Sequence, residues 1–157
     1  MMMEGMMKMV KSTLTEERAL DCYLGGIDCS QVTFGEFAEQ LGIDKMTARK
    51  IASAFGGGLF HARTCGCVTG ALMALGLACG YCEEGNEAAK NAFLAKKAEF
   101  EKRFEEENGS CICKELLGYD VSTPDGLAHI MEENLFQKRC APYAVSACEI
   151  AADLMNE

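Results

Sequence analysis

Cysteine is the residue type in this sequence that is best suited to chemistry, since ten of the 157 residues are cysteines. They stand at positions 22, 29, 65, 67, 79, 82, 111, 113, 140 and 148. A thiolate attacks disulfides and binds metal ions, so a group of cysteines can serve thiol–disulfide exchange or hold a metal centre. One cysteine alone is about as often a small buried apolar residue, but that explanation is poor for the whole set.

Several of the cysteines stand where a helix is expected to begin. Each of these has a capping residue before it or a proline after it, and they are Cys29, Cys65, Cys67, Cys111, Cys113 and Cys140. Unpaired backbone N–H groups and the positive end of the helix dipole lower the pKa of a thiol at such a place. Helix starts from distant parts of the chain can converge in a bundle, so we expect some of these sulfurs to meet.

Other motifs argue against familiar cofactors. Cys79 and Cys82 form a C-x-x-C motif, but it lies late in an expected helix and lacks the strand–helix setting of a thioredoxin site. Glu83 follows this motif where covalent haem attachment needs a histidine, so we expect no haem. No glycine-rich nucleotide motif occurs, so we expect no nucleotide. Cys148 lies among alanines and is expected in the core, while the spacing leaves the role of Cys22 open.

The elements that must position these cysteines are helices. Capping residues, glycines and apolar spacing predict helices over 13–25, 28–41, 44–55, 64–80, 83–107, 110–117, 123–134 and 142–155. No alternating run of β-branched residues predicts a strand. We therefore expect an all-α, single-domain helical bundle, with a methionine-rich extension over residues 1–14 and a cysteine-rich helical domain over 15–157.

The helix expected at about 64–80, with Thr64 as its cap, is rich in glycine and alanine and carries no charge. Gly66, Gly70, Ala74 and Ala78 recur every four residues, and such a stripe lets another helix backbone approach closely. Few of its residues are strongly apolar, so we expect a buried central helix rather than a membrane span.

Charge and the first residues bear on partners and location. The formal charge of −9, from 24 acidic against 15 basic residues, disfavours nucleic acids and anionic membrane surfaces as partners. The start M-M-M-E-G-M-M-K-M-V is interrupted by Glu4 and Lys8, so it does not predict a secretory signal. We therefore expect a reducing compartment, the cytoplasm, where clustered cysteines point to metal binding or catalysis.

Five separated motifs occur in a fixed order along the chain. They are Asp28-Cys29-Ser30-Gln31, Phe55-Gly56-Gly57-Gly58, the segment 65–76, the segment 113–118 and Cys140-Ala141-Pro142-Tyr143. Over roughly residues 15–155 the chain thereby resembles the C-GCAxxG-C-C family of redox-active proteins. The four cysteines that define that family match Cys29, Cys65, Cys113 and Cys140. Its C-G-A-x-x-G segment matches residues 65–70, except that Cys67 replaces the usual alanine.

The resemblance implies a redox function, and three kinds of cysteine site stay open, of which the first two are redox-active. The first is an iron–sulfur cluster for electron transfer, since such a cluster needs four thiolates and a related domain in split-Soret cytochromes is associated with an iron–sulfur centre. Its expected ligands are Cys29, Cys65, Cys113 and Cys140, with Cys67 and Cys111 as lesser candidates. The second is thiol–disulfide chemistry by the same four cysteines without metal. The third is structural zinc in an interaction module.

The partners and the activity stay open at this point. The chain is expected to be an oxidoreductase or an electron-transfer component with a redox partner that the sequence does not identify. The uncharged helix and the methionine-rich start are compatible with a homodimer. The roles of Cys22, Cys79, Cys82 and Cys148 are not fixed by the resemblance.

Overall fold

The computed structural model describes residues 9–157, so the first eight residues of the expected 1–14 extension lie outside the described residues. The elements are α1 (Glu16–Leu24), α2 (Cys29–Phe37), α3 (Lys45–Ile51), η2 (Gly58–Ala62), α4 (Gly66–Cys79), α5 (Glu87–Asn108), α6 (Cys113–Leu117), α7 (Pro124–Glu132), η3 (Phe136–Cys140) and α8 (Ala141–Asn156). Within residues 9–157, extended pairing is confined to one isolated bridge between Thr64 and Ile112. The all-α, single-domain prediction is confirmed.

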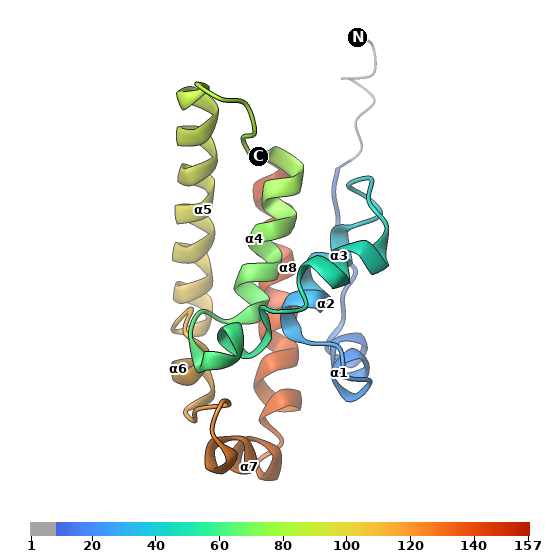
Figure 1. The fold of residues 1–157 in the computed structure, drawn as a ribbon, viewed down its shortest axis with the longest axis vertical. Coiled ribbons are helices and arrows are strands. Elements are labelled where there is room, and N and C mark those ends of the chain that lie inside the picture. Colours follow the sequence, from blue (N-terminus) through green and yellow to red (C-terminus); the bar gives the residue numbers. More distant parts are fainter. Residues whose placement is uncertain (1–8) are drawn as a thin grey trace.

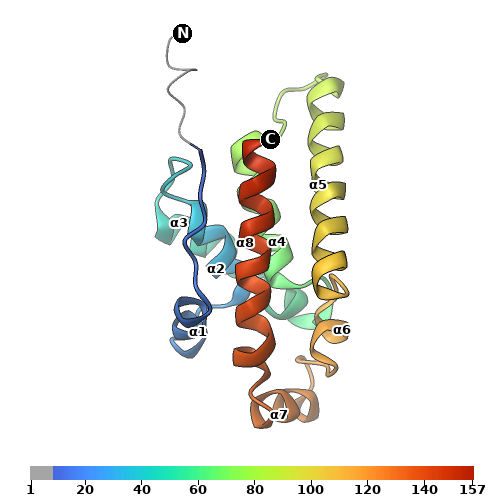
Figure 2. The same cartoon turned by 180° about the vertical axis from the view of Figure 1, so that it is seen from behind.

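The long helices α4, α5 and α8 run along the length of the molecule (Figures 1 and 2). Helices α1, α2 and α3 lie on the flank of α8 opposite to α5, and α7 lies at one end (Figure 2). Helix α4 packs against α2, α8 and α5, which confirms the prediction of a central glycine- and alanine-rich helix. No helix in the described part of the chain combines the length and the apolar character that crossing a membrane requires.

The small residues of α4 let α2 approach it closely. A Cβ atom at Gly70 would overlap the Thr33 hydroxyl and the Ser30 carbonyl, and one at Gly66 would lie 3.1 Å from the Ser30 amide nitrogen. Both glycines are buried. The two glycines of the predicted stripe therefore permit the close approach and bring the N-terminal halves of the two helices together, whereas Ala78 at the end of the stripe is exposed.

The start of α4 differs from the prediction. Thr64 does not cap the helix; instead its backbone pairs with Ile112, and the helix begins at Gly66 with Cys65 as its N-cap. The Cys65 amide donates to the Cys111 carbonyl at 2.7 Å, and the Cys113 amide donates to the Arg63 carbonyl at 2.6 Å. These backbone hydrogen bonds hold residues 63–65 beside residues 111–113, so two cysteine-bearing segments lie next to each other.

The described residues of the expected N-terminal extension are attached to the bundle. The amide of Val10 donates to the Asn156 side chain at 2.9 Å, and the amide of Thr13 donates to the Glu36 carboxylate at 2.7 Å. Leu14 is buried in the main core. Residues 10–14 therefore connect α8 and α2 through side-chain and backbone contacts.

Candidate redox site

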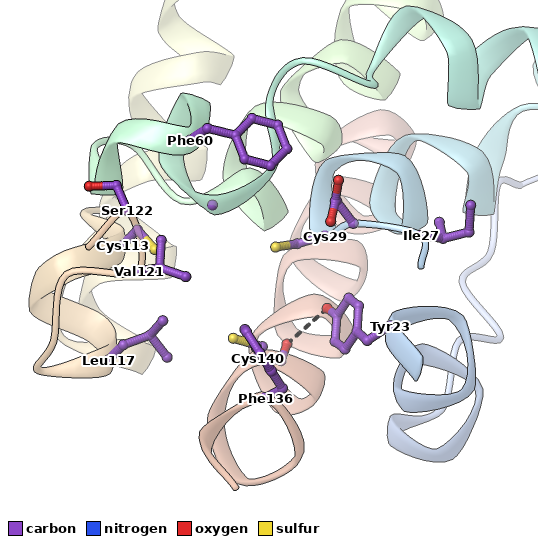
Figure 3. Close-up of a pocket in the computed structure, with 12 residues that line it drawn as sticks. Tyr23, Ile27, Cys29, Phe60, Cys113, Leu117, Val121, Ser122, Phe136 and Cys140 are labelled. Atoms are coloured by element: carbon purple, nitrogen blue, oxygen red, sulfur yellow. Dashed lines mark hydrogen bonds between the residues drawn. The ribbon is translucent and has the colours of Figure 1, made fainter. Parts of the chain in front are cut away.

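Three of the four cysteines expected from the resemblance line one cavity of about 220 Å³. They are Cys29 at the start of α2, Cys113 at the start of α6 and Cys140 at the end of η3 (Figure 3). The other walls are mostly apolar or aromatic and come from Tyr23, Ile27, Asp28, Gly57, Phe60, Leu117, Val121, Ser122 and Phe136. Thiols from three distant stretches of the chain thus share one pocket.

Cys29 is held by the N-terminal cap of α2. Asp28 is the cap residue, and its amide donates to the side-chain oxygen of Gln31 at 2.9 Å. A Cβ atom at Gly56 would collide with the Asp28 side chain, so the glycine turn packs directly against this cap. Burial raises the pKa of the Asp28 carboxyl. The half-buried Cys29 thiol follows this cap and points into the cavity (Figure 3).

The pKa of the Cys29 thiol is lowered despite its surroundings. A hydrogen bond from the Cys67 thiol is the largest cause, and the backbone N–H groups of Gly57 and of Cys29 itself act in the same direction. Burial and the negative charge of Asp28 oppose them. Hydrogen bonds to the charged form favour the thiolate, which is the nucleophilic and metal-binding form.

The residues beside Cys29 form a left-handed turn. The φ angles of Gly57, Gly58, Leu59 and Phe60 are 56°, 62°, 61° and 56°. Left-handed geometry costs roughly 1–2 kcal/mol for each residue that carries a side chain. Such strained backbone is concentrated at functional sites. Here the turn places Gly57 against Cys29 and puts Phe60, which is 52% exposed, at the cavity.

Cys65 and Cys113 are placed by the paired backbone segments at the starts of α4 and α6. Both side chains are buried. Burial raises the pKa of the Cys113 thiol to about 12, with smaller contributions from the charges of Cys65, Cys29 and Asp120. Cys65 does not line the cavity. It lies close enough for its charge to act on both Cys113 and Cys140.

Cys140 completes the set at the junction of η3 and α8. Burial raises the pKa of its thiol well above the ordinary value, and the charges of Cys29, Cys65 and Cys113 add to this. The hydroxyl of Tyr23 donates to the Cys140 carbonyl at 3.2 Å (dashed line in Figure 3). The structure thus brings together all four cysteines that the resemblance singles out, three at the cavity wall and Cys65 beside them.

Of the two lesser candidates, Cys67 joins this group. Its side chain is completely buried, and its thiol is close enough to Cys29 and Cys65 for both to act on its pKa. Its sulfur also lies 3.9 Å from the Tyr23 hydroxyl and 3.9 Å from the Cys140 carbonyl. The interactions with Cys29 and Cys65, followed by burial, raise the pKa of the Cys67 thiol well above the ordinary value.

Cys111, the second lesser candidate, faces away from the cavity. Its thiol donates to the Glu101 carbonyl at 3.9 Å, and it is not among the cavity residues. Burial is the largest cause that raises its pKa to about 12, ahead of the charges of Glu105 and Glu101. The structure therefore separates Cys111 from Cys113, although the two are only one residue apart in the sequence.

The remaining cysteines lie elsewhere. Cys79 is exposed at the last residue of α4, about 20 Å along the helix from Cys65 at the usual rise per residue, and Cys82 is exposed just after the helix. Cys148 is completely buried in the main core, as expected from its alanine neighbours. The guanidinium of Arg49 donates to the Cys22 sulfur at 3.8 Å in a different pocket.

Sequence reasoning did not identify Tyr23 or Phe60 as site residues. Neither lies in a motif with a chemical signature, and each is recruited by tertiary packing alone. The Phe55-Gly56-Gly57-Gly58 turn did carry a signal, because three consecutive glycines indicate a close backbone approach. In residues 9–157, no three His, Cys, Asp or Glu side chains are grouped as the ligands of a metal ion.

Comparison with known proteins bears on this arrangement. Neither a curated protein nor a solved structure matches the chain. A family model described as "Putative redox-active protein (C_GCAxxG_C_C)" matches residues 27–154, a span that contains Cys29, Cys65, Cys113 and Cys140. Since the match covers far more than half of the sequence, the chain belongs to this redox-active family.

Proposed function

We propose that this protein transfers electrons, and that Cys29, Cys65, Cys113 and Cys140 hold an iron–sulfur cluster. One observation carries the proposal: Cys29, Cys113 and Cys140 line one cavity of about 220 Å³, and Cys65 lies close enough for its charge to act on Cys113 and Cys140. Four cysteine thiolates are the usual ligand set of [2Fe–2S] and [4Fe–4S] clusters. When bound, such a cluster supplies a site that accepts and releases single electrons.

The chemistry of the donor set fits such a centre. Burial and the charges of neighbouring thiols raise the pKa of Cys113 and Cys140, so these side chains favour their neutral forms. None of the described residues that line the cavity is Lys, Arg or His, so no side-chain cation compensates a group of thiolates there. Cys29, Cys65, Cys113 and Cys140 would hold a metal centre as thiolates, and the positive charge of the metal would compensate them.

A single zinc ion suits the observed arrangement less well. Tetrahedral zinc with Zn–S bonds of about 2.3 Å needs its four sulfurs about 4 Å from each other. Among residues 9–157 no three potential ligands are grouped around one such point. Cys29, Cys113 and Cys140, which line the cavity, would together with Cys65 hold a cluster of several iron atoms instead.

A second candidate function is thiol–disulfide exchange without metal. It is favoured by the lowered pKa of Cys29, which is the thiol expected to attack a disulfide first. The cavity gives that thiol access to a small molecule. This candidate needs no iron, so metal analysis separates it from the first.

The location and the partners belong to the proposal. All ten cysteines are free thiols, which supports work in a reducing compartment such as the cytoplasm. The redox partner would approach the open side of the cavity, where the exposed Phe60 lies. A homodimer remains a proposal, to be tested by measuring the mass of the protein in solution.

The test is purification of the full chain without oxygen, followed by analysis of iron and acid-labile sulfide. We expect a brown protein, and substitution of Cys29, Cys65, Cys113 or Cys140 by serine should remove most of the iron. Cys79→Ser and Cys82→Ser are matched controls, because these thiols are exposed and remote from the cavity. A colourless protein without iron and sulfide, or equal iron in all variants, would refute the cluster.

A further inference from the structure

The backbones of α2 and α4 approach most closely beside two cysteines. A Cβ atom at Gly66 would lie 3.1 Å from the Ser30 amide nitrogen, and one at Gly70 would overlap the Ser30 carbonyl. Cys29 directly precedes Ser30, and Cys67 directly follows Gly66. The close helix contact therefore brings the backbones of Cys29 and Cys67 near each other. Such proximity is the first requirement of a disulfide, which spans Cα atoms no more than about 7 Å apart.

The two side chains meet on one side of this contact but differ in access. Each thiol is close enough to shift the pKa of the other. Cys29 is half-buried and lines the cavity, whereas Cys67 is completely buried behind it. Figure 3 shows the Cys29 sulfur directed into the cavity. An accessible thiol in front of an inaccessible one is the arrangement that a two-step disulfide exchange requires.

We propose that Cys29 and Cys67 are a dithiol pair that closes to an intramolecular disulfide when a small disulfide enters the cavity. The substrate class follows from the walls: a cavity of about 220 Å³ lined by Ile27, Leu117, Val121 and Phe136 fits a low-molecular-weight disulfide with apolar substituents. The inference deepens the thiol–disulfide candidate and uses no metal.

The chemistry balances in two steps. In the first, the Cys29 thiolate attacks one sulfur of R–S–S–R, one RS⁻ leaves, and a mixed disulfide remains on Cys29. In the second, Cys67 loses its proton and attacks the Cys29 sulfur, and the second RS⁻ leaves. The small disulfide is reduced to two thiols, and the pair loses two electrons and two protons.

This pairing differs from the one that spacing alone suggests. In the sequence Cys67 is the neighbour of Cys65, but a disulfide within C-x-C is strained. In the structure Cys29, which belongs to another helix, is the largest cause of the raised pKa of Cys67. Closure would also withdraw Cys29 from the proposed ligand set, so the oxidised protein is expected not to take up iron.

The test uses the full chain, prepared without iron, reduced, and treated without oxygen with diethyl disulfide. Free thiols are then alkylated, and the unreduced digest is mapped by mass spectrometry. We expect two thiols to be lost and a cross-link to join Cys29 to Cys67. Trypsin leaves Cys65 and Cys67 on one peptide and Cys22 and Cys29 on another, so fragmentation spectra must locate the bridge.

Variants make the result specific. With Cys67→Ala we expect a mixed disulfide to accumulate on Cys29, because the second step is blocked. Cys79→Ser and Cys22→Ser should keep the cross-link, because both thiols lie outside the cavity. The proposal is overturned if Cys67 remains alkylatable in the oxidised wild type, or if Cys29 links instead to Cys65, Cys113 or Cys140. Should Cys67→Ala not fold, the wild-type map decides alone. Iron and sulfide content, measured on a separate preparation, reports independently on the cluster.

Discussion

The Tyr23 hydroxyl donates a hydrogen bond of 3.2 Å to the Cys140 carbonyl, and so links the end of α1 to the start of α8 across the thiol cavity. The same hydroxyl lies 3.9 Å from the sulfur of Cys67. One phenol on the first helix therefore contacts two of the cysteines at the site, although more than a hundred residues separate Tyr23 from Cys140.

Tyr23→Phe should lower the free energy of unfolding by about 1 kcal/mol, because the largely buried Cys140 carbonyl loses the hydrogen bond from the Tyr23 hydroxyl. Urea denaturation measures this. Tyr119→Phe is the control: its hydroxyl bonds Glu133 at the surface, so its removal should cost less than about 0.5 kcal/mol. Equal effects of the two substitutions would mean that the Tyr23 bond contributes nothing particular to the site.

Gly70→Ala should destabilise the protein by about 1–3 kcal/mol, because the added methyl group overlaps Ser30 and Thr33 and pushes α2 from α4. Gly76→Ala on the same helix is the matched control. There the nearest atom to an added Cβ is the ring of Phe93 at 3.8 Å, an ordinary contact. Since alanine favours helices, Gly76→Ala should be neutral or stabilising by up to about 1 kcal/mol. Thermal melting of the two variants checks the difference.

Cys29 should alkylate at lower pH than Cys113, although both line the same cavity. The pKa of Cys29 is lowered by its hydrogen bond from Cys67, whereas burial raises that of Cys113 to about 12. Iodoacetamide labelling of reduced, metal-free protein, read by mass spectrometry, should therefore modify Cys29 at a lower pH than Cys113, which reacts only under alkaline conditions. If the labelling of both cysteines rose with pH in the same way, the predicted order, Cys29 before Cys113, would be contradicted.

The protein should lose stability as the pH rises above about 9. Burial raises the pKa of Cys113 from 9.0 to about 12 and also raises that of Cys148. Above pH 9.0, the unfolded chain has released these protons while the folded chain still holds them, so rising pH favours unfolding. Each such thiol can contribute up to about 1.4 kcal/mol per pH unit.

Urea unfolding from about pH 8 to about pH 10.5 measures this slope. Cys148→Ala removes one of the thiols and should flatten the dependence, even if the variant is less stable throughout. Tyrosines and lysines titrate in the same pH range, but they are identical in the wild type and in Cys148→Ala. A difference in slope between the two proteins therefore reports on Cys148. An unchanged slope in Cys148→Ala would show that this thiol is not protonated in the folded state above its usual pKa.

Local signals in the sequence predicted much of the fold. Asp28 and Thr123 cap α2 and α7 as expected, since capping depends on a side chain and the amides just after it. The glycine and alanine spacing of α4 predicted a close helix contact for a similarly direct reason, because only a small residue permits it. The four cysteines became candidates through the resemblance, and their convergence is a property of the fold.

Long-range contacts explain what the sequence could not show. Thr64 is a suitable cap, but the backbone of residues 63–65 pairs with residues 111–113, and backbone pairing leaves little trace in residue type. The contact of Cys67 with Cys29 depends on which side of α4 faces α2. Likewise, nothing in the sequence around Tyr23 indicates that its hydroxyl reaches the Cys140 carbonyl.

In the left-handed turn, substitution by glycine has the opposite of its usual effect on stability. Glycine normally weakens ordered backbone, yet at Leu59 and Phe60 it would relieve the steric penalty that their side chains impose at positive φ. A chain selected for folding stability alone would favour glycine there. The leucine and the phenylalanine therefore cost conformational free energy, and the phenylalanine places a phenyl ring in the wall of the thiol cavity.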